Sequence, residues 1–127
     1  MAKFKMPKPT DTELEILNVL WRRGALTVKE VHEELGEQTG YTTTLKFLQL
    51  MTEKGLVTRN ESQRAHVYQA RFAKTAMQRQ LLAGFLNKAF SGSTAELVMH
   101  ALASKRATQE ELSEIKELIE QLARENK

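Results

Sequence analysis

The sequence contains no cysteine, and only two of its 127 residues are proline. The missing thiols exclude disulfide bonds, thiolate metal sites and cysteine nucleophiles. No segment approaches the ~20 apolar residues that a membrane-spanning helix needs. The basic start, residues 1–9, also lacks the apolar stretch of a secretory signal. We therefore expect a cytoplasmic protein with no membrane partner.

Sequence motifs of known enzyme sites are missing as well. There is no glycine-rich phosphate loop, nucleophile elbow or zinc-protease motif. His32 is followed by Glu33 and Glu34, but adjacent residues point away from one another on a helix, so we interpret them as a solvated face and not as a metal site. We predict no catalytic residue, no metal site, no cofactor and no enzyme activity.

Charge is nearly balanced, with 19 Lys and Arg against 16 Asp and Glu, so the net charge of +3 does not identify a nucleic-acid binder. The local distribution is more informative. Residues 38–52 and 62–71 contain no acidic residue, which is weak support for contact with a polyanion, because gaps of this size also arise by chance. We expect residues 1–9, with Lys3, Lys5 and Lys8, to form a flexible basic arm.

Residues 42–54 show the clearest helical periodicity. Thr44, Phe47, Leu48 and Met51 recur at helical spacing and predict a buried stripe. The opposite face offers short hydroxyls, an amide, a cation and one apolar tip, which suit a helix lying in the DNA major groove. The predicted DNA contacts, including one residue of the wing described below, are Tyr41, Thr42, Thr43, Lys46, Gln49, Leu50 and Arg64.

The elements around this helix predict a winged helix-turn-helix domain over residues 10–71. Capping boxes at Thr10 and Thr27 open two earlier helices, and Leu14 and Trp21 belong to the expected inward stripe of the first. Two strands, 56–61 and 65–70, should follow as a hairpin whose tip, residues 62–64, would reach the DNA backbone or minor groove. The helix at 42 lacks the early glutamate of the capped helices, which leaves its positive end free for phosphate.

From residue 72 onward the pattern is helical, so we expect a fold that is mainly α with a small β-hairpin. Three short amphipathic helices in residues 72–127 make a poor independent core. A second copy would bury the excess apolar surface, and an intramolecular bundle is the alternative. The predicted dimerisation residues are Leu82, Phe85, Leu86, Phe90, Leu112, Ile115, Leu118, Ile119 and Leu122.

The order of several short motifs resembles the penicillinase-repressor family, which includes β-lactamase, methicillin-resistance and copper-responsive repressors. The motifs are Thr12–Leu17 with Leu20-Trp21, Leu26–Val31, Tyr41–Thr43 with Leu48, Glu53–Val57, Arg64–Tyr68 and Glu110–Leu112. The resemblance implies a homodimeric repressor that binds an inverted repeat with TACA/TGTA-like half-sites in double-stranded DNA. It implies that Thr42, Thr43 and Lys46 meet the groove, and that Arg64 meets the backbone.

The sequence departs from the family in three places. Leu50 stands where members often have Arg, the stretch Val98–Leu102 lacks the Asn-Phe pair cleaved in β-lactam-responsive members, and the cysteines of the copper-responsive branch are missing. The inducer and the regulated genes are therefore left open. Two other functions also stay open: a winged-helix module for protein contacts, which needs an apolar patch at residues 42–50, and a repressor that senses a small molecule in the dimerisation arm.

Overall fold

The computed structural model describes residues 6–36, 38–62 and 64–126. Lys3 and Lys5 of the predicted arm, and Gln63 of the predicted wing tip, lie outside the described residues. The chain forms two compact units, Met1–Leu82 and Ala83–Lys127. The first unit therefore extends beyond residue 71, where we expected the DNA-binding domain to end.

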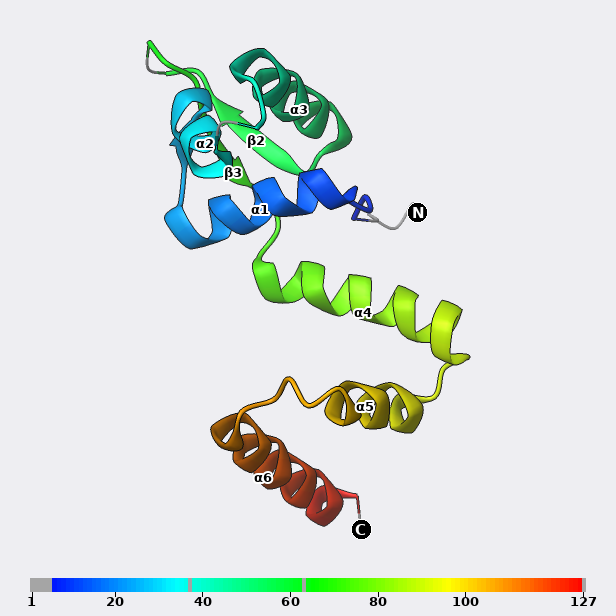
Figure 1. Ribbon diagram of the computed structural model, residues 1–127. Helices are drawn as coiled ribbons and strands as arrows, with labels where there is room; N and C mark the ends of the chain where they lie inside the picture. Colours follow the sequence, from blue (N-terminus) through cyan, green and yellow to red (C-terminus); the bar gives the residue numbers. More distant parts are fainter. Residues whose placement is uncertain (1–5, 37, 63, 127) are drawn as a thin grey trace. The chain divides into compact units, whose positions relative to one another are not determined.

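Three complete helices, the start of a fourth and a small sheet build the first unit (Figure 1). Helix α1 spans Asp11–Arg23, α2 spans Val28–Leu35 and α3 spans Tyr41–Lys54. The capping boxes predicted for α1 and α2 are confirmed. At α1 the Thr10 hydroxyl accepts a hydrogen bond from the Glu13 N–H (3.3 Å), and the Thr10 N–H donates to the Glu13 carboxylate (2.9 Å). Because this chemistry is local, the sequence alone locates both helix starts.

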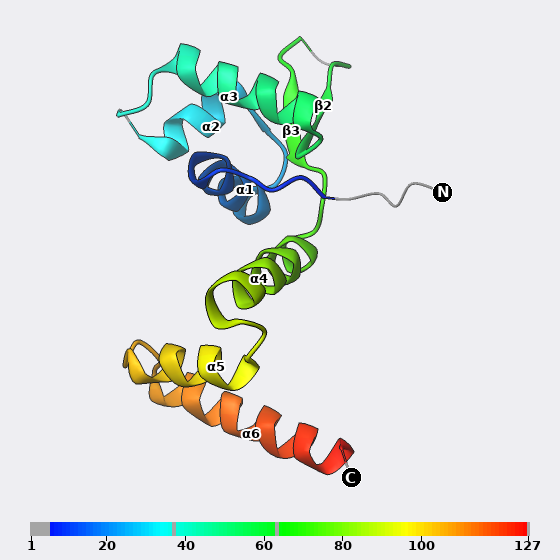
Figure 2. The ribbon, with the colours of Figure 1, turned by 90° about the vertical axis from the view of Figure 1, so that its right-hand side faces the viewer.

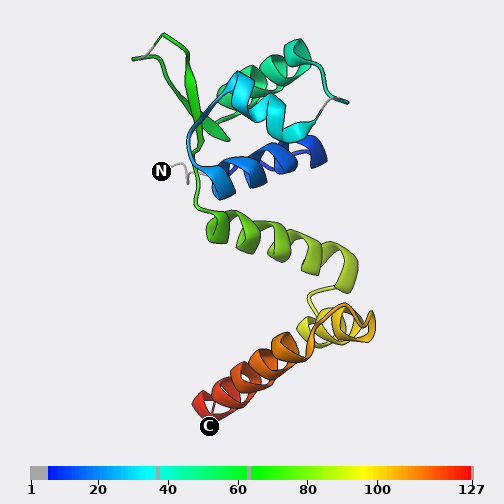
Figure 3. The ribbon, with the colours of Figure 1, turned by 60° about the vertical axis from the view of Figure 1, so that its left-hand side comes forward.

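The sheet has three antiparallel strands: β1 (Leu26–Thr27), β2 (Val57–Asn60) and β3 (Val67–Ala70). The predicted hairpin is confirmed as β2 and β3, with shorter strands than expected, and it projects beyond the three helices of the unit (Figure 2, Figure 3). The short link before α2 is itself a strand, because Leu26 pairs with Tyr68. The strand order β1-β3-β2 makes β3 the middle strand.

The core of the first unit draws apolar side chains from each helix and strand. Ile16 and Leu17 of α1 are buried, whereas Leu14 and Trp21, which we expected to point inward, are half-buried. Trp21 still ties two segments together, because its indole N–H donates to the Phe72 carbonyl (3.0 Å). The buried apolar residues are Ile16, Leu17, Val19, Leu20, Leu26, Val28, Val31, Leu48, Met51, Leu56, Val57, Tyr68 and Met77.

An ion pair between a buried glutamate and an exposed lysine joins the start of α1 to the end of α3. The Lys54 Nζ lies 2.6 Å from the Glu13 carboxylate, and the Glu13 side chain is only 5% exposed. Burial raises the pKa of Glu13, but hydrogen bonds from Lys54 and Thr10 and the charge of Lys54 outweigh it, so the pKa lies below its ordinary value of 4.5. The carboxylate is therefore more stable in the folded chain than in the unfolded one.

We expect Glu13→Gln to lower the free energy of unfolding by about 1–2 kcal/mol at pH 7, a value reduced for solvent screening because the Lys54 side chain is 38% exposed. The lowered pKa stabilises the fold above about pH 4.5 and ceases to do so as the pH falls through the folded-state pKa. Urea unfolding at pH 7 and pH 3 should show the difference between wild type and variant shrinking in acid. The matched control is Glu30→Gln, which changes the exposed glutamate of the α2 capping box and should have a smaller effect. A difference that grows in acid would contradict this assignment.

Helix α4 (Lys74–Phe90) begins in the first unit, where Met77 is buried and Leu81 packs against the core. Its last residues belong to the second unit together with α5 (Thr94–Ala103) and α6 (Gln109–Glu125). Ser93 and Thr108 cap α5 and α6. No helix in the described part of the chain is both long and apolar enough to cross a membrane.

The second unit has no buried core of its own. None of its described residues, 83–126, is buried, and the rings of Phe85 and Phe90 contact each other edge to face at 5.7 Å. Leu118 and Ile119 are each 54% exposed. Of the predicted dimerisation residues, Leu86, Phe90 and Ile115 are half-buried and the remainder are exposed: Leu82, Phe85, Leu112, Leu118, Ile119 and Leu122. The predicted excess of apolar surface is confirmed, and its burial by a second copy stays a prediction.

Candidate nucleic-acid interface

The ends of α3 fix its position beside the wing. The helix begins at Tyr41 with Gly40 as N-cap, one residue earlier than predicted, so Thr42 lies inside the first turn. It ends at Gly55, whose φ of 84° suits glycine, and a Cβ there would lie 2.8 Å from the Arg71 guanidinium. The Leu56 N–H donates to the Met51 carbonyl (2.9 Å), and the chain then enters β2 directly.

The two faces of α3 separate as the periodicity predicts. Thr44, Leu48 and Met51 are buried, whereas Phe47, which we expected to be fully inward, is half-buried. The predicted DNA contacts on this helix are all exposed: Tyr41, Thr42, Thr43, Lys46, Gln49 and Leu50. Tyr41 is 50% and Leu50 is 42% exposed, so both large side chains are available to a partner.

The first turn of α3 carries no acidic residue, whereas α1, α2, α5 and α6 each carry at least one there. The predicted contrast is confirmed for these helices. Helix α4 also begins without an acidic residue, so this feature does not single out α3. What distinguishes α3 is the combination of an unneutralised positive end with an exposed face that has no acidic residue before Glu53.

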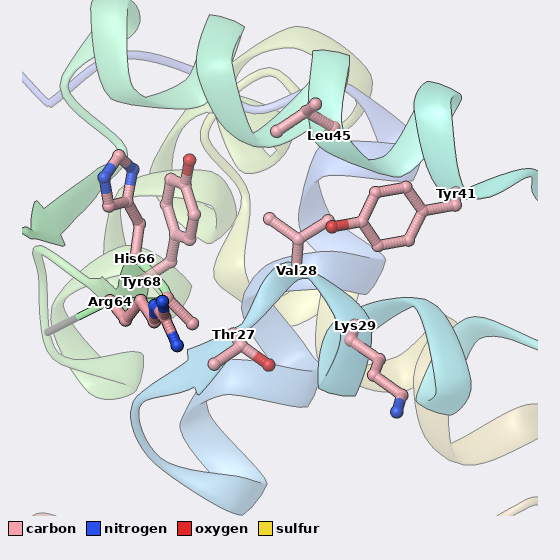
Figure 4. A pocket seen from close by; sticks show the side chains of 9 residues that line it. Thr27, Val28, Lys29, Tyr41, Leu45, Arg64, His66 and Tyr68 are labelled. Atoms are coloured by element: carbon pink, nitrogen blue, oxygen red, sulfur yellow. The ribbon is translucent and has the colours of Figure 1, made fainter.

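A groove of about 340 Å³ brings the start of α3 together with the wing and the start of α2 (Figure 4). Arg64 and His66 lie on one side of it, Tyr41 and Lys29 lie on the other, and Val28 lies between them. The remaining lining residues are Thr27, Leu45, Ala65 and Tyr68. The structure thus unites two predicted contacts, Tyr41 and Arg64, that are 23 positions apart in the sequence.

Lys29 and His66 were missed by the sequence analysis. Lys29 lies in the first turn of α2, and its place beside α3 depends on how the two helices pack, which periodicity does not reveal. His66 lies in the acid-free stretch 62–71, and this was the signal that could have identified it. Both side chains add nitrogen donors to a groove whose described lining contains no carboxylate.

The two arginines of the wing differ in their surroundings. Arg59 of β2 forms an ion pair with Glu61 at 2.6 Å. Its hydrogen bond to Tyr68, reinforced by the charge of Glu61, raises the pKa of the Arg59 guanidinium. Arg64 is exposed at the end of the hairpin. Arg59 therefore stabilises the base of the wing, and Arg64 is the cation that the wing presents to a partner.

A second groove, of about 280 Å³, runs along the exposed face of α3. It brings together four of the predicted contacts, Thr42, Thr43, Lys46 and Leu50, and adds Phe47. Gln49 is exposed on the same helix but does not line either groove. Hydroxyl and ammonium donors beside apolar carbon match the mixed surface of base edges and phosphates in DNA.

Comparison with known proteins agrees with this geometry. A sequence model described as penicillinase repressor matches residues 9–121. The chain is 24% identical over 119 residues to the penicillinase repressor of Bacillus licheniformis, covering 92% of this chain and 93% of that protein. It is 19% identical over 112 residues to the methicillin resistance regulatory protein MecI of Staphylococcus aureus, covering 87% and 91%. The solution structure of the DNA-binding domain of the repressor BlaI matches with a TM-score of 0.50 and 26% identity, over 56% of this chain and 89% of that one.

Proposed function

Because the chain belongs to the penicillinase repressor family, we propose that it is a DNA-binding transcriptional repressor and not an enzyme. In this proposal a homodimer binds an inverted-repeat operator through α3, residues 42–54, and through the wing, residues 62–64. Residues 10–71 bind DNA and residues 72–127 hold the two copies together. The observation that carries the proposal is the exposed surface of α3 beside the basic wing, which has no acidic residue from Tyr41 to Thr52.

Contacts to bases and contacts to phosphates come from different residues in this proposal. Thr42, Thr43 and Gln49 have uncharged polar side chains on the face of α3 that would enter the major groove, where they can read base edges. Lys46 and Arg64 are exposed cations suited to phosphate oxygens. Phosphate contacts fix the register on the duplex, and the base contacts select the sequence.

The second unit supplies the reason for a dimer. Its described residues have no buried core, and half-exposed leucine and isoleucine side chains line α6. Two copies related by a two-fold axis would bury these faces against each other. The same axis would present two α3 helices to two half-sites of opposite orientation, so the operator would be an inverted repeat.

A DNA titration of the full chain tests the proposal. The probe is duplex DNA from the promoter of the protein's own operon, studied by gel shift at two salt concentrations with a scrambled competitor of equal length. Salt-sensitive binding that survives the competitor is the expected result. Equal loss to the scrambled DNA would reject sequence-specific repression and would favour a protein-interaction module or a general DNA coat.

We expect Lys46→Ala and Arg64→Ala each to weaken binding and to flatten its salt dependence. Each lost phosphate contact should reduce the slope of log K against log salt by about 0.9, and a dimer loses two contacts, or about 1.8. The slope is measured by fluorescence anisotropy between low and moderate salt. Lys88→Ala removes an exposed cation from the end of α4 and serves as the control that should leave the slope unchanged. Unchanged slopes for both interface variants would remove Lys46 and Arg64 from the phosphate contacts.

A further inference from the structure

The groove along α3 has more apolar surface than is needed for a helix face that contacts bases by hydrogen bonds alone. Thr42, Lys46 and Leu50 follow one another at intervals of four residues, so their side chains stack along one line of the helix. Thr43 and Phe47 form the neighbouring line. The surface of the groove is mostly apolar, since it consists of an aromatic ring, a leucine side chain, threonine methyls and the lysine stem.

Phe47 holds this apolar surface in place. Its side chain is half-buried and packs against the core of the first unit, while the same residue lines the groove. Leu50, which is 42% exposed, lies beside it. The groove is therefore anchored to the core on one side and open to a partner on the other, so a group that enters it meets a preformed surface.

The chemistry around the groove specifies the partner. Lys46 contributes a positive charge to the lining, and residues 38–52 contain no acidic residue, so a polyanion is favoured over an uncharged apolar segment. The major groove of DNA presents one apolar group, the C5-methyl of thymine, beside the thymine O4 acceptor. The threonine hydroxyls can donate to O4 while carbon receives the methyl. Cytosine offers a donor and no methyl at the same place.

We propose that the groove formed by Thr43, Phe47 and Leu50 receives the C5-methyl group of a thymine in each operator half-site, which makes Leu50 a specificity-determining residue. This inference rests on the proposed function, because it needs α3 to lie in the major groove. It adds the chemical group by which a thymine of the half-site is read and the residues of this chain that read it.

Replacing thymine by uracil tests the inference, because uracil pairs identically and lacks only the methyl group. An operator is first selected from a random duplex library with the full-length protein. Each thymine of one half-site is then replaced by deoxyuridine in turn, and affinities are measured by anisotropy. Wild type should lose about fourfold in affinity at one position or more, the factor expected for one buried carbon at about 0.8 kcal/mol. Leu50→Ala should show little or no loss at that position.

Gln49→Ala provides the matched control on the same helix. Gln49 is exposed but lies outside the groove, so this variant should keep the fourfold ratio between thymine and uracil DNA even where both affinities fall. Leu50→Ala removes an exposed side chain, so the fold should persist; circular dichroism and thermal melting check it directly.

The outcomes separate this inference from the proposed function. A selected half-site that contains no thymine, or thymines that all tolerate uracil, overturns the methyl contact while leaving a sequence-specific repressor. A Leu50→Ala variant that loses as much as wild type moves the contact away from this groove. A library that yields no preferred sequence overturns both proposals, and the groove would then fit the apolar patch of a protein-interaction module.

Discussion

Replacing Ile119 by Asp should make the protein monomeric and lower its affinity for a complete operator by about 10²–10⁴-fold, because the avidity of two linked binding sites is lost. Ile119 is 54% exposed on α6, where its neighbours along the same face are also apolar. A carboxylate there cannot be buried against a second copy without a large desolvation cost. Sedimentation velocity measures the oligomeric state, and anisotropy measures the affinity.

Ser113→Asp is the matched control. It adds the same charge to the same helix on the side away from the apolar residues, and Ser113 is exposed, so both dimer and affinity should be retained. Deletion of residues 108–127 is a second test and should also give a monomer. An Ile119→Asp variant that still sediments as a dimer would place the interface elsewhere, and a monomeric wild type at micromolar concentration would reject the homodimer itself.

Leu48→Ala should lower the free energy of unfolding of the first unit by about 2–5 kcal/mol, the usual cost of removing a fully buried leucine side chain. Leu48 is 0% exposed and belongs to the core cluster beneath α3. The substitution leaves a cavity under the helix that we propose enters DNA, so operator binding should weaken at temperatures where the unit begins to unfold. Urea denaturation followed by circular dichroism gives the size of the loss.

Leu50→Ala is the paired measurement for this substitution. It makes the same change two residues further along α3, at a side chain that is 42% exposed, and should alter stability by no more than about 0.5 kcal/mol. The two variants should thus affect different properties: Leu48→Ala should reduce stability, and Leu50→Ala should reduce the discrimination between thymine and uracil. Equal losses of stability would mean that Leu50 also supports the core. A change in DNA binding by Leu50→Ala could then no longer be separated from a change in folding.

Local chemistry explains what the sequence predicted well. The capping boxes at Thr10 and Thr27 each involve two residues three positions apart, so their pattern is visible without knowledge of the tertiary fold. The direction of the α3 faces follows from the period of the helix in the same way. Periodicity shows on which face of a helix a side chain lies, but not how deeply that side chain is buried. For this reason Phe47 was expected to be buried, whereas it is half-buried and lines the groove.

Contacts between distant segments account for what was missed. Glu13 was recognised as a capping residue, but its ion pair with Lys54 joins residues 41 positions apart. The pairing of Leu26 with Tyr68, and the place of Lys29 beside the start of α3, likewise depend on tertiary packing. These contacts become visible only when the helices and strands are assembled, because no single segment contains both partners.

The place of β3 in the sheet has a consequence for the growing chain. β3 is the middle strand, yet it follows β1 and β2 in the sequence, and Met77 completes the buried core still later. A ribosome that has just added residue 54 has made α3 and α2, against which it packs, but neither β2, which also packs against α3, nor Met77 of the core. At about 5–20 residues per second, the 23 residues from 54 to 77 take about one to five seconds. During that interval the hairpin and the last core residue are added, so the surface that joins α3 to the wing is secured only when Met77 is in place.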